Sequence, residues 1–274
     1  MKEINFSFLS KWIKKANEED GGLLIGEMIL REEFGKLDFT PKKCFFLMTF
    51  LDYLWSTSLR KHIYKGKGDL QEIAMRLSKA IPGIEEKLKH LQDMDLIKLD
   101  LSEENKDYII LEKCVMEAKD CNNSGGISFP CKFLHFLEPK IFVPMDTKVP
   151  IALDDFKIKI ISSVEGYLKL LQTYKLIESK LTHEQKQRLI KEDYEQICNN
   201  LKVFYDLKNI KESNIFRIID KALWIYGKHL EDYKTISRLK KQLINGKKSE
   251  KDKKKIEIKI KNLEKKYKDF RKNI

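Results

Sequence analysis

The sequence predicts an all-α fold in which a mostly helical body is followed by a basic helical hairpin. Only six prolines and twelve glycines interrupt 274 residues, which favours long helices over many short strands. Apolar residues recur three and four positions apart through most of the chain, as they do on the buried face of a helix. The chain is long enough for one large domain or two small ones, and its hydrophobic fraction of 42% suffices for a buried core.

The positive charge is confined to the end of the chain. Residues 234–274 hold 17 lysines and arginines against 5 acidic residues, whereas the remainder holds 37 of each. The whole net charge of +12 therefore belongs to the tail, and we predict a helical body over 1–230 and a basic tail over 231–274. Such a tail suits sequence-independent attraction to phosphates. A solvated lysine-rich helix without a ligand is the alternative.

Most of the body reads as helix. Thr40 and Pro41 are a good N-cap and first residue, and the helix that follows is apolar around much of its circumference, so we expect it to be central. Thr182 and Gln185 form a capping-box pattern. The expected helices are 5–17, 23–34, 41–63, 163–178, 182–204 and 214–229.

Residues 69–112 predict two helices separated by Pro82 and Gly83, then a short β-hairpin near 96–112. This order resembles that of a winged-helix DNA reader, with 83–94 entering the major groove. That helix carries more acidic than basic side chains, which disfavours contact with phosphates. A non-catalytic winged-helix DNA-binding protein with a basic dimerising tail is the alternative function.

The tail combines charge with an apolar heptad stripe. The stripe consists of Ile256, Ile260, Leu263, Tyr267, Phe270 and Ile274. A second stripe precedes it, and Asn245-Gly246 supplies a turn, so we expect a hairpin of helices 230–245 and 250–273. The sequence does not decide what the 256–274 seam packs against: the sister helix, the body, or a second subunit in a homodimer. The lysines expected to contact nucleic acid are Lys247, Lys248, Lys251, Lys253, Lys254 and Lys255.

The stretch 126–149 carries the candidate chemistry. A glycine loop opens a helix bearing Lys132, and a short extended return leads to Asp146, which is placed to cap the next helix. Burial and the dipole at a helix N-terminus both favour a neutral lysine amine, the form that attacks carbonyl-like carbons. A nearby carboxylate activates a nucleophile or stabilises a cation. The alternatives are a solvated Lys132, an Asp146 that only caps, and a His135 without a catalytic role.

This stretch resembles the catalytic segment of the helix-hairpin-helix DNA glycosylases, the endonuclease III and 8-oxoguanine glycosylase superfamily. Residues 143–149, Val-Pro-Met-Asp-Thr-Lys-Val, are similar to the family's V-D-[TV]-H-V segment, and Gly126 to Lys132 matches its hairpin and lysine helix. The chain lacks the L-P-G-[VI]-G hairpin and the iron–sulfur cysteines, and Lys148 replaces the family's histidine.

The resemblance implies a DNA glycosylase, with or without lyase activity at abasic sites, that flips its target base into a pocket. It implies catalytic roles for Lys132 and Asp146, and nucleic-acid contacts by Gly125, Gly126, Ser128 and Lys148. Trp224 and Tyr226 either stack on the flipped base or belong to the core. A pure interaction protein that docks through the heptad seam is a third class.

No cofactor or metal is expected. The spacing of Cys114, Cys121 and Cys131 contains no C-x2-C pair, so the thiols are interpreted as reduced and structural. The longest apolar runs fall far short of a membrane span, and residues 1–25 show no signal core. We therefore expect a cytoplasmic protein with DNA as its partner and no membrane.

Overall fold

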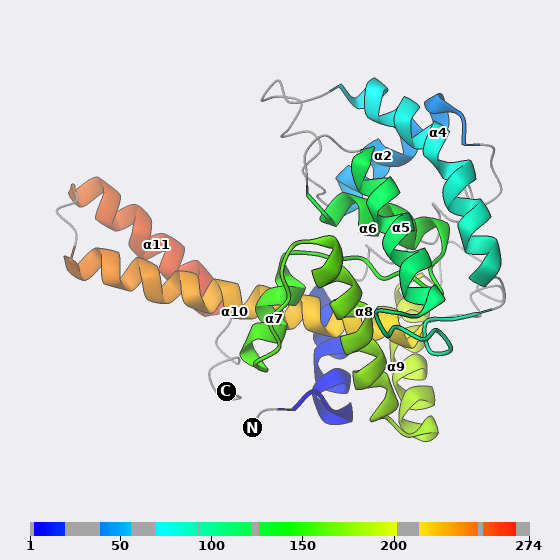
Figure 1. Cartoon of the computed structure of the whole chain (residues 1–274). Coiled ribbons are helices and arrows are strands. Elements are labelled where there is room, and N and C mark those ends of the chain that lie inside the picture. The colour runs from blue at the N-terminus through cyan, green and yellow to red at the C-terminus, as the bar shows by residue number, and fades with distance from the viewer. Residues whose placement is uncertain are drawn as a thin grey trace.

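The computed structural model describes residues 3–19, 39–55, 69–91, 94–121, 126–201, 214–245 and 249–266, and confirms the all-α fold (Figure 1). These residues contain no strand. The elements are a helix over 6–19, α2 (Pro41–Trp55), α4 (Leu70–Leu88), the 3-10 turn η1 (Lys89–Leu91), α5 (Lys106–Asp120), α6 (Ser128–Leu137), α7 (Lys148–Asp155), α8 (Val164–Ser179), α9 (His183–Leu201), α10 (Ile215–Asn245) and α11 (Glu250–Lys266).

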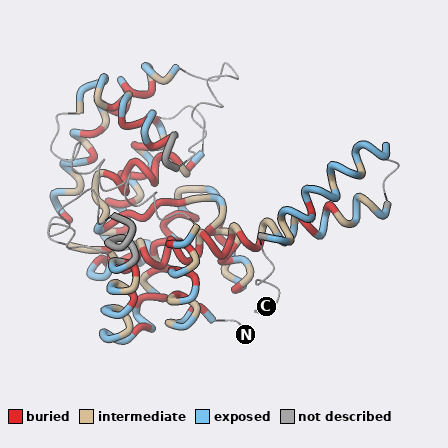
Figure 2. The backbone as a smooth tube through the Cα atoms, turned by 180° about the vertical axis from the view of Figure 1, so that it is seen from behind, coloured by how far each residue is buried: buried red, intermediate tan, exposed pale blue. Residues whose placement is uncertain are grey.

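The first half of α10 forms the centre of the body, where α7, α8 and α9 pack around it. Figure 2 shows α10 buried within the body and increasingly exposed beyond it. Gly227 allows α7 to approach closely, because a Cβ at this position would lie 1.9 Å from the carbonyl oxygen of Lys148. The start of α7 therefore rests directly on the backbone of α10.

The prediction that helix 41–63 is central is wrong in the part that the structure describes. α2 packs with α4 and α6 in a smaller hydrophobic cluster at one end of the body. Phe46 and Phe50 are exposed. An apolar circumference indicates burial but does not specify against which layer a helix packs. The expected helix 23–34 lies outside the described residues, as do residues 56–63.

The winged-helix prediction for 69–112 is also wrong. α4 continues through Pro82 and Gly83 without a turn, because Ile73, Leu77 and Ile81 lead on to Ile84 along one buried face. A continuous face that packs on α2 and α5 outweighs the hydrogen bond that a helical proline forfeits.

The expected β-hairpin near 96–112 is replaced by a turn and the helix α5. Asn105 caps α5 by accepting the backbone N–H of Asp107 at 2.9 Å, and the apolar run that resembles a strand continues at helical spacing. Side chains from α8 take the place of a partner strand, since Gln172 donates to the carbonyl of Leu101 at 2.6 Å and Lys175 to that of Leu99.

The tail forms the predicted helical hairpin. Ile256, Ile260 and Leu263 of α11 pack against the preceding helix, which is the second half of α10. Their partners there are Ile236, Leu239 and Leu243. Lys240 and Glu264 form an ion pair across the two helices at 2.5 Å. The described part of the seam thus uses the sister helix, and Tyr267, Phe270 and Ile274 lie outside the described residues.

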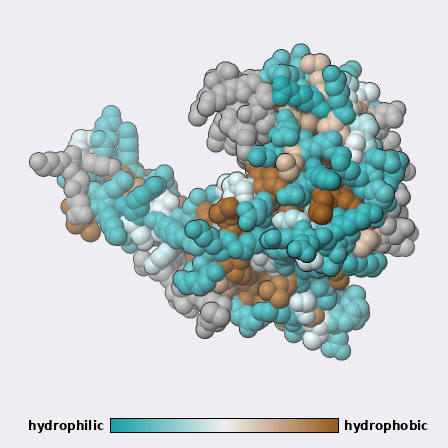
Figure 3. Space-filling model, in the orientation of Figure 1, coloured by the Kyte–Doolittle hydropathy of each residue, from teal (hydrophilic) through white to brown (hydrophobic). Residues whose placement is uncertain are grey.

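The hairpin projects from the body as an arm, because α10 continues without a break across the predicted boundary at residue 230 (Figure 1). Figure 3 shows a concave outline between this arm and the end of the body that holds α2 and α4. Within the described ranges, no helix combines the length and the apolar character that a bilayer span requires.

Candidate functional site

Lys132 lies on α6, a helix enclosed by both hydrophobic clusters of the body. Phe129, Phe133 and Phe136 face the cluster of α2 and α4, while Cys131 and Leu134 face the main core. The Lys132 side chain is only 2% exposed. The alternative of a solvated Lys132 on an amphipathic helix is therefore wrong, and the amine has to find its polar partners inside the protein.

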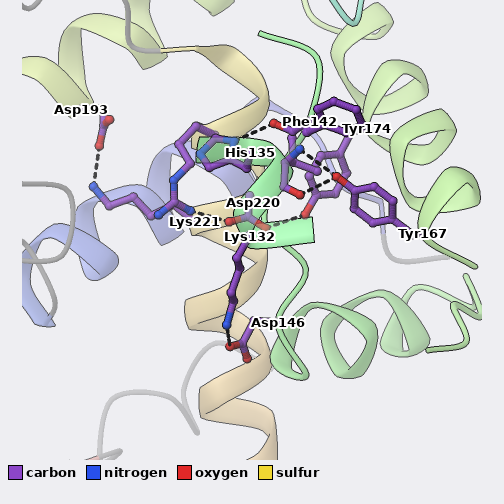
Figure 4. Close-up of polar contacts among 11 residues, drawn as sticks. Lys132, His135, Phe142, Asp146, Tyr167, Tyr174, Asp193, Asp220 and Lys221 are labelled. Atoms are coloured by element: carbon purple, nitrogen blue, oxygen red, sulfur yellow. Dashed lines mark hydrogen bonds and ion pairs between the residues drawn. The ribbon is translucent and has the colours of Figure 1, made fainter. Parts of the chain in front are cut away.

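The return segment that follows α6 is held by side chains at three backbone positions. His135 donates its Nδ1–H to the carbonyl of Phe142 at 2.6 Å. The Tyr167 hydroxyl donates to the carbonyl of Val143 at 2.7 Å and accepts the same residue's N–H at 3.1 Å. Ser128 donates to the carbonyl of Met145 at 2.9 Å. Residues 142–145 are thus fixed immediately before Asp146 (Figure 4).

Both carboxylate oxygens of Asp146 accept hydrogen bonds, one of them from the Thr147 hydroxyl to Oδ1 at 3.3 Å. Its Oδ2 lies 3.2 Å from the Nζ of Lys132, and its Oδ1 accepts the backbone N–H of Lys148 at 3.1 Å at the start of α7. Asp146 therefore caps the helix and pairs with the lysine at the same time (Figure 4). Its side chain is 25% exposed, so the ion pair reaches solvent on the Asp146 side.

The pKa of Lys132 is lowered, and the largest cause is burial. The negative charge of Asp146 and its hydrogen bond act in the opposite direction, as does the charge of Asp220, whereas Arg217 lowers the pKa further. Lys132 is the fifth residue of α6, where the helix dipole has little effect, so desolvation rather than the dipole favours the neutral amine.

Asp220 is a buried carboxylate of α10 that the sequence reasoning missed. It accepts from the Tyr174 hydroxyl at 3.0 Å and pairs with Arg217 at 2.5 Å. Figure 4 places it beside Lys132 on the side away from Asp146. The available signal was a charged pair, Asp220-Lys221, inside the apolar run from Ile218 to Leu223.

Several of the predicted nucleic-acid contacts are engaged inside the protein. Lys148 pairs with Glu231 at 2.5 Å, and the Ser128 hydroxyl proton is used by Met145. Gly126 is exposed beside the start of α6, while Gly125 lies outside the described residues. Of the three that the structure describes, Gly126 is the one that is exposed and forms no side-chain contact.

The predicted tail lysines differ in their surroundings. Lys251, Lys254 and Lys255 are exposed on α11 and form no ion pair with any described residue. Lys253 instead pairs with Glu250 at 2.8 Å. Lys247 and Lys248 lie outside the described residues.

The aromatic and histidine candidates belong to the core. Tyr226 is buried, donates its hydroxyl to Asp155 at 2.7 Å and packs against Phe8, Trp12 and Phe156. Trp224 is half-buried, and Lys228 lies over its ring. His135 is buried, and its imidazole is hydrogen-bonded to the carbonyl of Phe142.

Cys44, Cys114, Cys121 and Cys131 are buried free thiols. Burial raises the pKa of Cys44 and Cys121 to about 11 and that of Cys114 to about 12, and it raises the pKa of Cys131 well above its usual value. They are protonated near neutral pH. No group of three or more metal-binding side chains occurs among the described residues.

Comparisons with protein-family models, curated proteins and solved structures found no match for this chain.

Proposed function

We propose that this protein is a DNA glycosylase that uses Lys132 and Asp146 to remove a base from DNA, with abasic-site lyase activity through Lys132. One observation carries the proposal: a lysine that is 2% exposed, with a lowered pKa, lies 3.2 Å from a carboxylate that reaches solvent. Burial favours the neutral amine that a nucleophile needs, and the carboxylate beside it is placed to stabilise a developing cation.

The reaction needs the ion pair to open toward the DNA. A flipped nucleotide enters from the exposed Asp146 side, and its sugar replaces Asp146 Oδ2 as the neighbour of Nζ. The neutral amine attacks the anomeric carbon, a C–N bond forms, and the glycosidic bond breaks so that the base leaves with the bonding electron pair. The Lys132 nitrogen, which is positively charged once it bonds to carbon, releases one proton, and the departing base takes up one proton. Asp146 stabilises the positive charge that develops on the sugar.

Support for Asp146 comes from the way it is held. The side chains of His135, Tyr167 and Ser128 fix the backbone that delivers it, and the α7 N-terminus holds one of its oxygens. Positioning of this kind reduces the reorganisation that a charge-stabilising group would otherwise undergo.

DNA, rather than a second subunit on the 256–274 seam, is the partner we propose, because Ile256, Ile260 and Leu263 already face α10.

Borohydride trapping on a duplex with an abasic site tests the amine. The wild-type chain should form a covalent protein–DNA adduct, and Lys132→Met should abolish it. Methionine fills a similar volume without burying an unpaired polar group, so the variant should fold. Lys140→Gln, an exposed lysine of the same segment, should trap as wild type does. An adduct of equal yield in Lys132→Met would contradict the role of Lys132.

Asp146→Asn tests the carboxylate in the same assay. It keeps the size of the cap and removes the charge, so base release should fall by orders of magnitude. It also leaves the Lys132 amine without its nearest anion, and the variant should lose stability that is regained in the double variant with Lys132→Met. A destabilised Asp146→Asn with unchanged base release would restrict Asp146 to a structural role.

A further inference from the structure

One face of α11 is a continuous stripe of lysines that no acidic side chain interrupts. The residues on this face recur at spacings of three and four, as positions on one side of a helix do. They are Lys251, Lys254, Lys255, Ile258, Lys261, Asn262 and Lys265. All seven are exposed, and we call this surface the lysine face.

The lysine face points away from α10. The opposite side of α11 carries Ile256, Ile260 and Leu263, which pack on α10. The acidic residues of α11 lie beside this face and not on it: Glu250 pairs with Lys253 and Glu264 with Lys240, while Asp252 and Glu257 are exposed on the flanks. The five lysines of the face form no ion pair with any described residue. The face therefore carries an excess of positive charge along the helix, with Asp252 and Glu257 as the nearest exposed acidic residues.

The dimensions suit a polyanion. From Lys251 to Lys265 the helix advances about 21 Å at about 1.5 Å per residue. Duplex DNA carries one negative charge per about 1.7 Å of its axis, so the same length presents on the order of twelve phosphates. The face also belongs to the arm that borders the concave outline of the molecule (Figures 1 and 3).

The chemistry of the face favours nucleic acid over other anions. A helix that lies on a membrane needs a broad apolar side, and the apolar side of α11 is occupied by α10. Ile258 is the one apolar residue of the lysine face. Protein interfaces are depleted in lysine, whereas flexible ammonium groups suit phosphates that need no planar match.

We propose that the lysine face of α11 binds the phosphate backbone of duplex nucleic acid without reading its sequence. The proposal takes DNA as ligand, as the proposed function does, but requires no reaction at Lys132. It replaces Lys253 of the sequence-based set with Lys261 and Lys265, since Lys253 is turned toward Glu250.

The test is a five-fold variant of the full chain, in which Lys251, Lys254, Lys255, Lys261 and Lys265 are all changed to Gln. Lysine and glutamine have similar helix propensities, so the arm should keep its helicity in circular dichroism. The matched control changes five exposed helical lysines of the body to Gln and thus removes the same charge. The control positions are Lys14, Lys106, Lys113, Lys169 and Lys191.

Binding to an undamaged duplex is measured as a function of salt. The slope of log affinity against log salt should become shallower by about 0.9 for each lost contact, up to about 4.5, in the α11 variant. The control should change the slope by less than about 0.9, the value for one phosphate contact. A variant with all five positions changed to Arg should bind as wild type does, which separates charge from helix geometry.

Three outcomes would overturn the proposal. The first is an α11 variant with the wild-type slope, and the second is a control that loses as much as the α11 variant. The third is loss of binding to vesicles containing phosphatidylserine with duplex binding retained, which would make the ligand a membrane.

If the glutamine variant loses helicity, the pair Lys254→Glu and Lys261→Glu is compared with Lys106→Glu and Lys113→Glu. Borohydride trapping at saturating DNA should persist in the α11 variant, so failure here and failure at Lys132 give different results.

Discussion

At the scale of single residues, the ion pair of Lys132 and Asp146 shows what a sequence can and cannot specify. The pattern of a lysine helix, an extended return and a capping aspartate indicates that the two residues belong together, and they lie 3.2 Å apart. The pattern does not indicate how deeply the lysine is buried. That depends on α6 lying between two hydrophobic clusters, which is a property of packing among distant segments.

Asp220 was missed for the same reason. It follows Lys132 by 88 positions, and only the fold brings its charge close enough to act on the amine. Local patterns predict caps such as the Thr182–Gln185 box, whose two hydrogen bonds are present at 3.0 and 3.2 Å. They carry no information about a carboxylate that approaches from another part of the chain.

The lowered pKa of Lys132 predicts how abasic-site cleavage depends on pH. Only the deprotonated amine attacks, so the rate should rise with pH and level off below 10.5, the ordinary value for lysine. Asp146 and Asp220 favour the protonated form, and Arg217 opposes it. Single-turnover rates measured across pH should show the plateau, and Asp146→Asn should shift it to lower pH. A rate that still rises at pH 10.5 would mean that the attacking amine has no lowered pKa.

The same shift has a consequence for stability. The folded chain releases the Lys132 proton at a lower pH than the unfolded chain, so the unfolded state binds more protons between the two pKa values. The burial of this lysine therefore destabilises the protein below the folded pKa. That destabilisation is relieved as pH rises toward 10.5.

At the scale of helices, periodicity predicts an element well where one face is buried and fails where turn residues compete with packing. The expected helix 163–178 is observed as α8, at Val164–Ser179. Pro82-Gly83 has the composition of a turn, yet it lies inside α4 because the buried face continues past it. The apolar run at 108–111 has the composition of a strand, but Cys114, Val115 and Ala118 extend it at helical spacing.

The close contact of α7 with α10 gives a prediction about Gly227. A methyl group there would meet the Lys148 carbonyl, and neither backbone can yield without moving α7 and the Asp146 that caps it. Gly227→Ala should cost about 1–3 kcal/mol of unfolding free energy in denaturant titrations, and base release should fall with it.

Gly83→Ala is the matched control for this helix substitution. A Cβ at Gly83 would meet the end of the Glu117 side chain, which can move aside. Since alanine is also the better helix former, the unfolding free energy should change by less than about 1 kcal/mol. Equal losses at the two glycines would mean that the contact between α7 and α10 does not limit stability.

At the scale of the whole molecule, charge and apolar contacts both separate the arm from the body. The cluster that joins α10 and α11 is distinct from the two clusters of the body, with Leu263 also contacting the main core. Residues 1–233 hold as many acidic as basic side chains. The sequence predicted this charge division directly, because counting charges requires no knowledge of packing.

Deleting residues 234–274 should therefore leave a body that still folds. The deletion removes both sides of the α10–α11 cluster together, so little apolar surface should be newly exposed. Circular dichroism and thermal unfolding should show a cooperative helical body. Its binding to duplex should be weak and nearly independent of salt, while single-turnover chemistry at saturating DNA should persist. A deletion that folds and keeps the full salt slope would place the phosphate contacts on the body.

The continuity of α10 makes the molecule a lever. A helix of 31 residues is a rod of about 46 Å, with Asp220 near one end, Gly227 near the middle and the support for α11 at the other end. A tilt of about 10° about Gly227 would carry residue 245, about 27 Å away, sideways by about 5 Å. The same tilt moves Asp220, which lies closer to Gly227, by a smaller distance, so a large displacement of the arm corresponds to a small displacement beside Lys132. Because α10 is one continuous helix, its two ends rotate together. A force on the arm therefore also acts on the part of α10 that carries Asp220.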